Sequence, residues 1–124
     1  MSERTALIVV ADDDPDIVAL VRAVLTRAGF DVVGAPDGAE ALELVRTRHP
    51  QLVVLDVAMP KLDGKEVLRL LRAEPETAEL PVVLLSARVQ ETDVRDGYAQ
   101  GASKYVRKPF SPRELVDVVR ELLD

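Results

Sequence analysis

The chain has 124 residues, of which 48% are apolar and 31% are charged, so it can bury the core of one globular domain without disulfides or a structural metal. It has no cysteine and one histidine, which excludes thiolate chemistry and leaves little basis for zinc sites or histidine triads. A net charge of −6 and an aromatic content of 3% argue against a direct nucleic-acid-binding surface.

The sequence contains no apolar run of membrane-spanning length and begins without an apolar signal segment. We therefore expect a cytoplasmic protein that does not bind a membrane. Its length further predicts that residues 1–124 form a single domain.

Short apolar segments and amphipathic segments alternate five times along the chain. Apolar runs rich in β-branched residues predict strands at residues 6–11, 31–35, 52–55, 82–85 and 104–106. Helical spacing of apolar residues follows each run, and the predicted helices begin near residues 15, 38, 65, 90 and 112. The helix predicted over residues 90–100 has the weakest apolar face.

Capping residues mark three of these helix starts. Asp14 and Ser111 are each followed by a proline at the first helical position, where the missing N–H of proline is harmless. Asp37 is followed three residues later by Glu40, which is the spacing of a capping box, and Ser111 is followed by Glu114 at the same spacing. Asp14 and Asp37 thus have structural roles, whereas the two acids before Asp14 are not explained in this way.

This alternation predicts an α/β domain with a doubly wound, five-stranded parallel sheet that helices cover on both faces. In such sheets, ligands bind beyond the carboxyl ends of the strands, where the strand order reverses. The polar residues at these ends are Asp12 and Asp13 after the first strand, Asp56 after the third, Ser86 after the fourth and Lys108 beyond the fifth. In the strand order 2-1-3-4-5 the first and third strands are neighbours, so the three carboxylates face one crevice.

Each of these residues alone has a structural explanation, because acids and serines at strand ends commonly form turns. Their convergence favours a functional site. Three carboxylates in one crevice repel each other unless a proton or a cation is bound, and an all-oxygen site without histidine or cysteine suits Mg²⁺. Lys108 supplies a positive charge and Ser86 a hydroxyl donor, and both suit a phosphoryl group on Asp56.

The motifs that carry these residues resemble, over essentially the whole chain, the receiver domain of bacterial two-component response regulators, the CheY-like family. They are Asp12-Asp13 before Pro15, Asp56-Val-Ala-Met-Pro60 followed by Asp63-Gly64, Ser86-Ala87, and Lys108-Pro109-Phe110. The resemblance implies a flavodoxin-like (βα)5 fold. It also implies that Asp56 accepts a phosphoryl group from the phosphohistidine of a sensor histidine kinase or a phosphotransfer protein, or from a small phosphodonor such as acetyl phosphate.

For the metal, the resemblance implies that Asp13 and Asp56 bind Mg²⁺ directly, together with the backbone carbonyl of Ala58. Asp12 is implied to act mostly through a bound water. Lys108 is implied to pair with the phosphoryl oxygens.

The resemblance also implies a switch. Ser86 stands at the family's threonine or serine position and would move to hydrogen-bond the phosphate, while Tyr105 stands at the aromatic switch position and would turn inward. The face formed by the fourth helix, the fifth strand and the fifth helix would then change its affinity for a downstream effector protein or domain. The family often has a cis peptide at this Lys-Pro pair, which we therefore expect between Lys108 and Pro109.

Some positions vary within the family. Ala58 offers no side chain to position a hydrolytic water and Arg88 is bulky and cationic, so we expect both to influence the lifetime of the phosphate. At four positions where the winged-helix transcription-factor branch usually has Lys, Asp, Asp and Arg, this chain has Val94, Ser103, Lys104 and Val118. These replacements disfavour the dimer of that branch and predict a monomer or a weak, phosphorylation-dependent dimer.

Three alternatives remain open. An aspartyl-phosphate phosphohydrolase would need a second acid two residues after the nucleophile, where Ala58 stands. A nucleotide-binding domain would need a glycine-rich loop after the first strand, where three acids repel phosphate instead. The third is a receiver-like module that binds partners without phosphorylation, although every residue that phosphorylation requires is present. We therefore predict a signalling domain and not an enzyme, assisting only its own phosphorylation and dephosphorylation.

Overall fold

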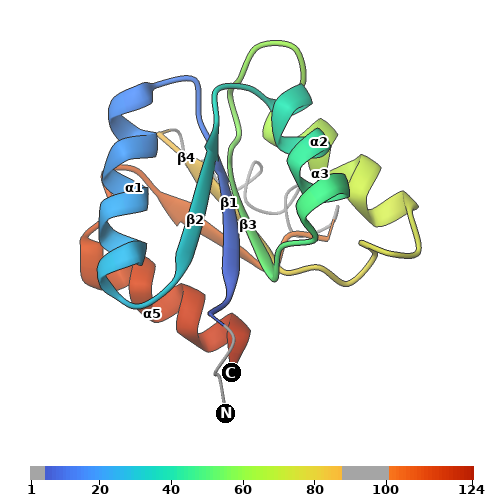
Figure 1. Ribbon diagram of the computed structural model, residues 1–124. Coiled ribbons are helices and arrows are strands. Elements are labelled where there is room, and N and C mark those ends of the chain that lie inside the picture. Colours follow the sequence, from blue (N-terminus) through green and yellow to red (C-terminus); the bar gives the residue numbers. More distant parts are fainter. Residues whose placement is uncertain (1–4, 88–100) are drawn as a thin grey trace.

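Five parallel strands form a single sheet in the computed structural model, in the order β2-β1-β3-β4-β5 (Figure 1). The strands are β1 Leu7–Ala11, β2 Asp31–Ala35, β3 Leu52–Asp56, β4 Val82–Ser86 and β5 Lys104–Arg107. The structure describes residues 5–87 and 101–124. The predicted five-stranded, doubly wound sheet and its strand order are confirmed.

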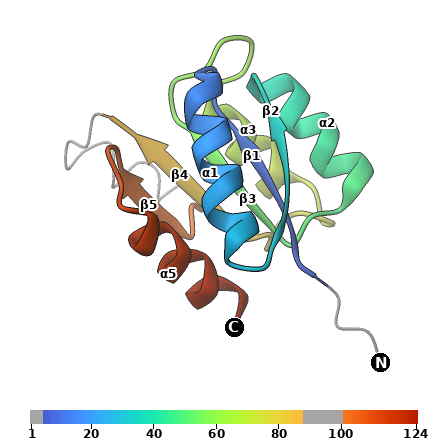
Figure 2. The ribbon, with the colours of Figure 1, turned by 60° about the vertical axis from the view of Figure 1, so that its left-hand side comes forward.

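Helices cover both faces of this sheet (Figures 1 and 2). Those in the described residues are α1 Pro15–Arg27, α2 Gly38–Arg48, α3 Gly64–Ala73 and α5 Pro112–Leu123. Helices α1 and α5 pack on one face, and α2 and α3 pack on the other. The helix predicted over residues 90–100 lies outside the described residues. Among residues 5–87 and 101–124, no helix combines the length and the apolarity that a membrane span requires.

Alternate residues of the strands pack into two separate apolar cores. Val9 of β1 belongs to the core under α2 and α3, whereas Ile8 and Val10 belong to the core under α1 and α5. Because successive side chains of a strand point to opposite faces, a strand covered on both faces needs an uninterrupted apolar run. All residues of β3 and β4 are buried, including the polar residues Asp56 and Ser86 at their ends.

Three of the five strands extend further toward the carboxyl edge than the sequence predicts. β3 ends at Asp56, β4 at Ser86 and β5 at Arg107, each one residue beyond its expected end. The polar side chains suggested loops, but the backbone ladder continues through them. The N–H of Val57, for example, still donates to the carbonyl of Leu85 at 2.9 Å. The acid and the serine are therefore held by the rigid sheet and not by loops.

The predicted helix caps are confirmed. The side chains of Asp14, Asp37 and Ser111 each accept a hydrogen bond from a backbone N–H of the following first turn, at 2.9, 2.8 and 3.0 Å. A fourth cap was missed: Asp63 accepts from the N–H of Glu66 at 2.8 Å, and the Glu66 side chain accepts from the N–H of Asp63 at 3.2 Å. In the sequence, Asp63 and Gly64 were recognised only as part of a motif, yet Asp63 is also the N-cap of α3.

Candidate functional site

Three carboxylates meet at the carboxyl ends of β1 and β3. Asp12, Asp13 and Asp56 each offer a carboxylate oxygen, and these oxygens all lie within 4.8 Å of one another. Asp12 is 1% exposed and Asp56 is 5% exposed, whereas Asp13 is exposed. Two buried negative charges and one accessible negative charge thus share one small volume, as the order of the strands predicts.

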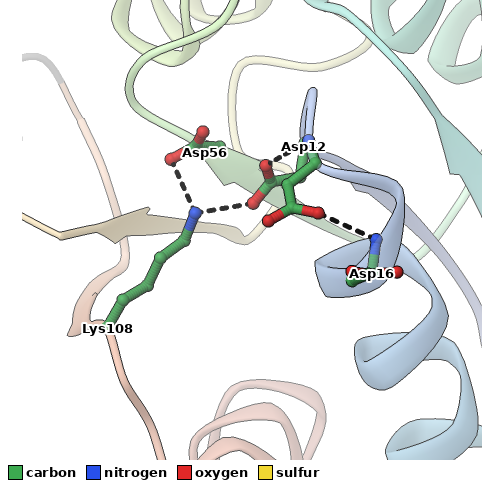
Figure 3. Close-up of polar contacts among 5 residues, drawn as sticks. Asp12, Asp16, Asp56 and Lys108 are labelled. Atoms are coloured by element: carbon green, nitrogen blue, oxygen red, sulfur yellow. Dashed lines mark hydrogen bonds and ion pairs between the residues drawn. The ribbon is translucent and has the colours of Figure 1, made fainter.

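Lys108 reaches between two of these acids from the segment after β5 (Figure 3). Its Nζ donates to Asp12 Oδ2 at 2.7 Å and lies 3.2 Å from Asp56 Oδ1. The backbone fixes the lysine, because its N–H donates to the carbonyl of Ser86 at 2.8 Å. The peptide bond between Lys108 and Pro109 is cis, as expected.

The electrostatics of the cluster leave the metal-free site short of positive charge. The pKa of Asp56 is raised to about 6, first by burial and second by the negative charge of Asp12, against the opposing effects of Lys108 and of the Ala58 N–H. Burial lowers the pKa of Lys108, but its hydrogen bond to Asp12 and the charges of Asp56 and Asp12 outweigh burial and raise that pKa overall. One ammonium therefore faces three carboxylates, which is an arrangement that favours binding a further cation.

The backbone around Asp56 is held from both sides. The N–H of Gly64 donates to the carbonyl of Val57 at 3.0 Å, which closes the β3–α3 loop, residues 57–63, at its base. A Cβ on Gly64 would lie 2.4 Å from the carbonyl oxygen of Asp56. Only a glycine lets the first turn of α3 pack this closely behind the acid. The N–H of Ala58 hydrogen-bonds to the Asp56 carboxylate, so the loop also orients the carboxylate.

Ser86 and Tyr105 lie on the same cavity as the acids. This cavity has a volume of about 580 Å³ and is lined by Asp12, Asp13, Asp14, Asp56, Val57, Ala58, Ser86, Ala87, Tyr105 and Lys108. Ser86 is 6% exposed. Tyr105 is half-buried, packs against the core under α2 and α3, and its buried hydroxyl has no hydrogen-bond partner within the described part of the chain.

The structure therefore brings together every residue that the sequence analysis selected for the site. Asp14, which the sequence explained only as a helix cap, also supports the site. Its backbone N–H donates a hydrogen bond to Asp12 Oδ1 at 3.0 Å. The contributions of Gly64 and of the Ala58 N–H were missed, and the only sequence signal for them was the Asp-Gly pair before a helix. Arg88 and Val94, for which a role in phosphate lifetime and in dimer formation was considered, lie outside the described residues.

Comparison with known families agrees with this geometry. The family model of the response regulator receiver domain matches residues 8–120. The chain belongs to this family. It is thus a receiver domain of the response regulators of two-component systems, and its cluster of acids stands where such domains have their acidic pocket.

Relatives of this receiver domain are regulators. The chain is 45% identical over 116 residues to the alkaline phosphatase synthesis transcriptional regulatory protein PhoP of Bacillus subtilis. The aligned residues cover 94% of this chain and 48% of that protein. It is 43% identical over 116 residues to the DNA-binding response regulator MtrA of Mycolicibacterium smegmatis, covering 94% and 50% of the two chains. The chain spans about half the length of the curated relatives it matches.

Solved structures share the fold over almost the whole receiver domain. The receiver domain of the Francisella response regulator 1452 matches with a TM-score of 0.90 at 35% identity, covering 96% of this chain and 97% of that one. The chemotaxis protein CheY4 of Vibrio cholerae matches with a TM-score of 0.92 at 28% identity, covering 97% and 100%.

Proposed function

We propose that this receiver domain accepts a phosphoryl group on Asp56 in an Mg²⁺-dependent reaction. A carboxylate oxygen of Asp56 would attack phosphorus, and the bond from phosphorus to the donor would break. The donor is the phosphohistidine of a sensor histidine kinase or a phosphotransfer protein, or a small acyl phosphate. The observation that carries the proposal is a buried acid at a strand end that shares one cavity with two further acids and a lysine.

The side chains present fit Mg²⁺. The donors are all oxygen, two of the three acids are buried, and the only cation within 4.0 Å of their carboxylates in the described residues is Lys108. Asp13 and Asp56 would hold the ion directly with the backbone carbonyl of Ala58, and Asp12 would act through water. The ion would neutralise the carboxylates and the negative charge that develops on the transferring phosphoryl group.

Lys108 and Ser86 would contact the oxygens of the phosphoryl group on Asp56. The ammonium already lies 3.2 Å from Asp56 and stays protonated because its pKa is raised. It is therefore placed to pair with a phosphoryl oxygen, and the Ser86 hydroxyl on the same cavity can donate to another.

We propose that Ser86 and Tyr105 couple this event to partner binding. The structure describes Tyr105 with a buried hydroxyl on the cavity. Among the described residues this hydroxyl has no partner, and a buried hydroxyl without one is costly, so this inward position would compete with an outward one in which water satisfies the group. Movement of Ser86 toward the phosphate would stabilise the inward position, and the surface around β5 would change with it.

The receiver domain would act on other proteins and not as an enzyme. Its relatives are named as transcriptional or DNA-binding regulators, and this chain covers only about half of their length. We propose that residues 1–124 form a single receiver domain and that its output is binding to an effector protein or domain in the cytoplasm, as a monomer or a weak dimer. It would contact neither nucleic acid nor membrane directly. The alternative is a module that binds partners without phosphorylation, and phosphoryl transfer from an acyl phosphate with the variant Asp56→Asn decides between the two.

The variant Asp13→Ala should bind Mg²⁺ at least roughly 10-fold more weakly than the wild type, because a direct ligand contributes no less than the outer-shell groups whose loss costs about that much. Isothermal titration of the metal-free protein with Mg²⁺ measures the affinity. Asp16→Ala is the matched control, since Asp16 is an exposed acid nearby, in the first turn of α1, and lies outside the cluster. Equal affinities of Asp13→Ala and the wild type would exclude Asp13 as a ligand.

The variant Lys108→Ala should still accept a phosphoryl group but lose the response of the switch. In the wild type, phosphorylation should shift the backbone amide resonances of Tyr105 and Val106 in nuclear magnetic resonance spectra, and in the variant these shifts should be absent or at most a small fraction. Arg107→Ala is the control, because Arg107 is the adjacent, exposed cation. Full shifts in phosphorylated Lys108→Ala would contradict the role proposed for the lysine.

A further inference from the structure

The β3–α3 loop is fixed at its base by Val57, and Ala58, whose carbonyl is the proposed metal ligand, lies nearer the tip. Two backbone hydrogen bonds hold Val57: its N–H donates to the carbonyl of Leu85, and its carbonyl accepts from the N–H of Gly64. Ala58 follows directly and is exposed. At the tip, Lys61 adopts a left-handed conformation with φ of 68°, and the N–H of Leu62 donates to the carbonyl of Pro60 at 2.8 Å. This backbone conformation and this hydrogen bond shape the tip, but they do not attach it to the rest of the domain.

Two contacts attach the β3–α3 loop to the rest of the domain: Met59 is buried in the core under α2 and α3, and the tip makes a close backbone contact with the start of α2. A Cβ on Gly38, the first residue of α2, would lie 1.9 Å from the carbonyl oxygen of Leu62 and 2.7 Å from its carbonyl carbon. Real Cβ atoms essentially never come within 3.0 Å of another heavy atom. The contact therefore exists only because residue 38 has no side chain. Leu62 also packs its own side chain against the core under α2 and α3.

An ion pair lies beside this contact. Lys61 Nζ is 3.6 Å from Asp37 Oδ2, and Asp37 is the buried N-cap of α2. The lysine side chain is 71% exposed, so the pair is screened by water and contributes little by itself. Two neighbouring residues of the loop thus meet two neighbouring residues at the start of α2, and the backbone contact is the one that fixes their distance.

We propose that Gly38 is a positioning residue for the metal site: the start of α2 seats the tip of the β3–α3 loop and so sets where the Ala58 carbonyl points. This inference rests on the proposed function, in which that carbonyl binds Mg²⁺. Gly38 itself touches neither the metal nor the phosphoryl group. Mg²⁺ requires near-ideal octahedral geometry, so a displacement of the loop by about 1 Å is enough to weaken binding.

The test compares Mg²⁺ affinity and loop conformation in two variants that approach the contact from opposite sides. Gly38→Ala forces the loop away from α2, and Leu62→Ala removes the packing that holds the tip, without emptying a fully buried position. Val119→Ala is the control, because it truncates a fully buried side chain of α5 in the other core and lowers stability without touching the loop. Isothermal titration gives the affinity, and amide resonances of residues 57–63 in the metal-free proteins report the loop.

We expect Gly38→Ala to bind Mg²⁺ about 10-fold more weakly and Leu62→Ala about 3-fold more weakly, as for other groups that orient a ligand without being one. Both variants should shift the amide resonances of residues 57–63 before any metal is added, and Val119→Ala should keep the wild-type affinity. Intrinsic helix propensity favours alanine over glycine, so propensity alone would predict no loss from Gly38→Ala.

The outcomes separate this inference from the proposed function. If the wild type binds no Mg²⁺, the proposed metal site is wrong and the role of Gly38 falls with it. If the wild type binds Mg²⁺ and both variants keep its affinity, the metal site stands and the positioning role is wrong. Weaker binding by Val119→Ala to the same extent would also overturn the inference, because the loss would then follow stability and not the loop. If Gly38→Ala does not fold, Leu62→Ala alone decides.

Discussion

The variant Asp56→Asn is expected to take up no phosphoryl group under conditions in which the wild type takes up one. In the wild type, Mg²⁺ and a small acyl phosphate should add a single phosphoryl group, because one carboxylate lies at the end of β3 with the lysine and the two further acids around it. Asparagine keeps the size of the side chain but its amide is not a nucleophile. Intact-mass measurement detects the added group directly.

Two controls show whether the label resides on Asp56. Asp16→Asn removes a nearby exposed carboxylate and should be labelled like the wild type. Removing Mg²⁺ with a chelator should prevent labelling of the wild type and of Asp16→Asn, because the acids then repel the incoming phosphodonor anion. Labelling that persists in Asp56→Asn would refute the phosphoacceptor proposal. Partner binding without any labelling of the wild type would favour the phosphorylation-independent alternative.

The same substitution is expected to stabilise the metal-free protein at neutral pH. The pKa of Asp56 rises from 3.8 to about 6 on folding, first because of burial and second because of the charge of Asp12. The folded state therefore holds this proton to a higher pH than the unfolded chain, so the contribution of Asp56 to stability falls as the pH rises. The loss of folding stability caused by ionised Asp56 is absent below about pH 4, develops up to about pH 6 and is complete at pH 7.

A shift of this size corresponds to a gain on the order of 2 to 3 kcal/mol for Asp56→Asn at pH 7 in the presence of a chelator. Urea unfolding of both proteins at pH 4 and pH 7 measures it, and the difference should shrink toward zero at the lower pH. Saturating Mg²⁺ should reduce or reverse this gain in stability, because the ion binds the folded wild type more tightly than it binds the folded Asp56→Asn variant. A variant that is less stable than the wild type at pH 7 without metal would show that the ionised acid is well compensated by Lys108.

The sequence predicted the sheet and the meeting of the acids because both depend on patterns that local residues carry. The apolar runs of β1 and β3 predict buried strands, and the parallel order that makes these strands neighbours brings the acids at their ends together. The strand ends were placed one residue too early because a polar side chain interrupts an apolar run but not a backbone ladder. Asp56 and Ser86 are therefore more rigidly held than their polarity suggested.

Other features of the site depend on distances that no local pattern encodes. Gly38 and Gly64 each look like ordinary turn residues in the sequence, yet Gly38 permits a backbone contact with Leu62 of another loop, and Gly64 lets α3 begin directly against the backbone of Asp56. The burial of the Tyr105 hydroxyl likewise depends on the surrounding core and not on its neighbours along the chain. Such close approaches become visible only when the elements have been packed together.

The bridge from Lys108 to Asp12 joins residues 96 positions apart in the chain. Because the last strand must be in place before the lysine can reach the first, no folding intermediate that lacks β5 can contain the complete site. A truncated or partly folded copy would present carboxylates without their ammonium. The response of the switch to phosphorylation therefore requires β5 to be in place, so the phosphorylation-dependent shifts at Tyr105 and Val106 would count only those molecules in which β5 has joined the sheet.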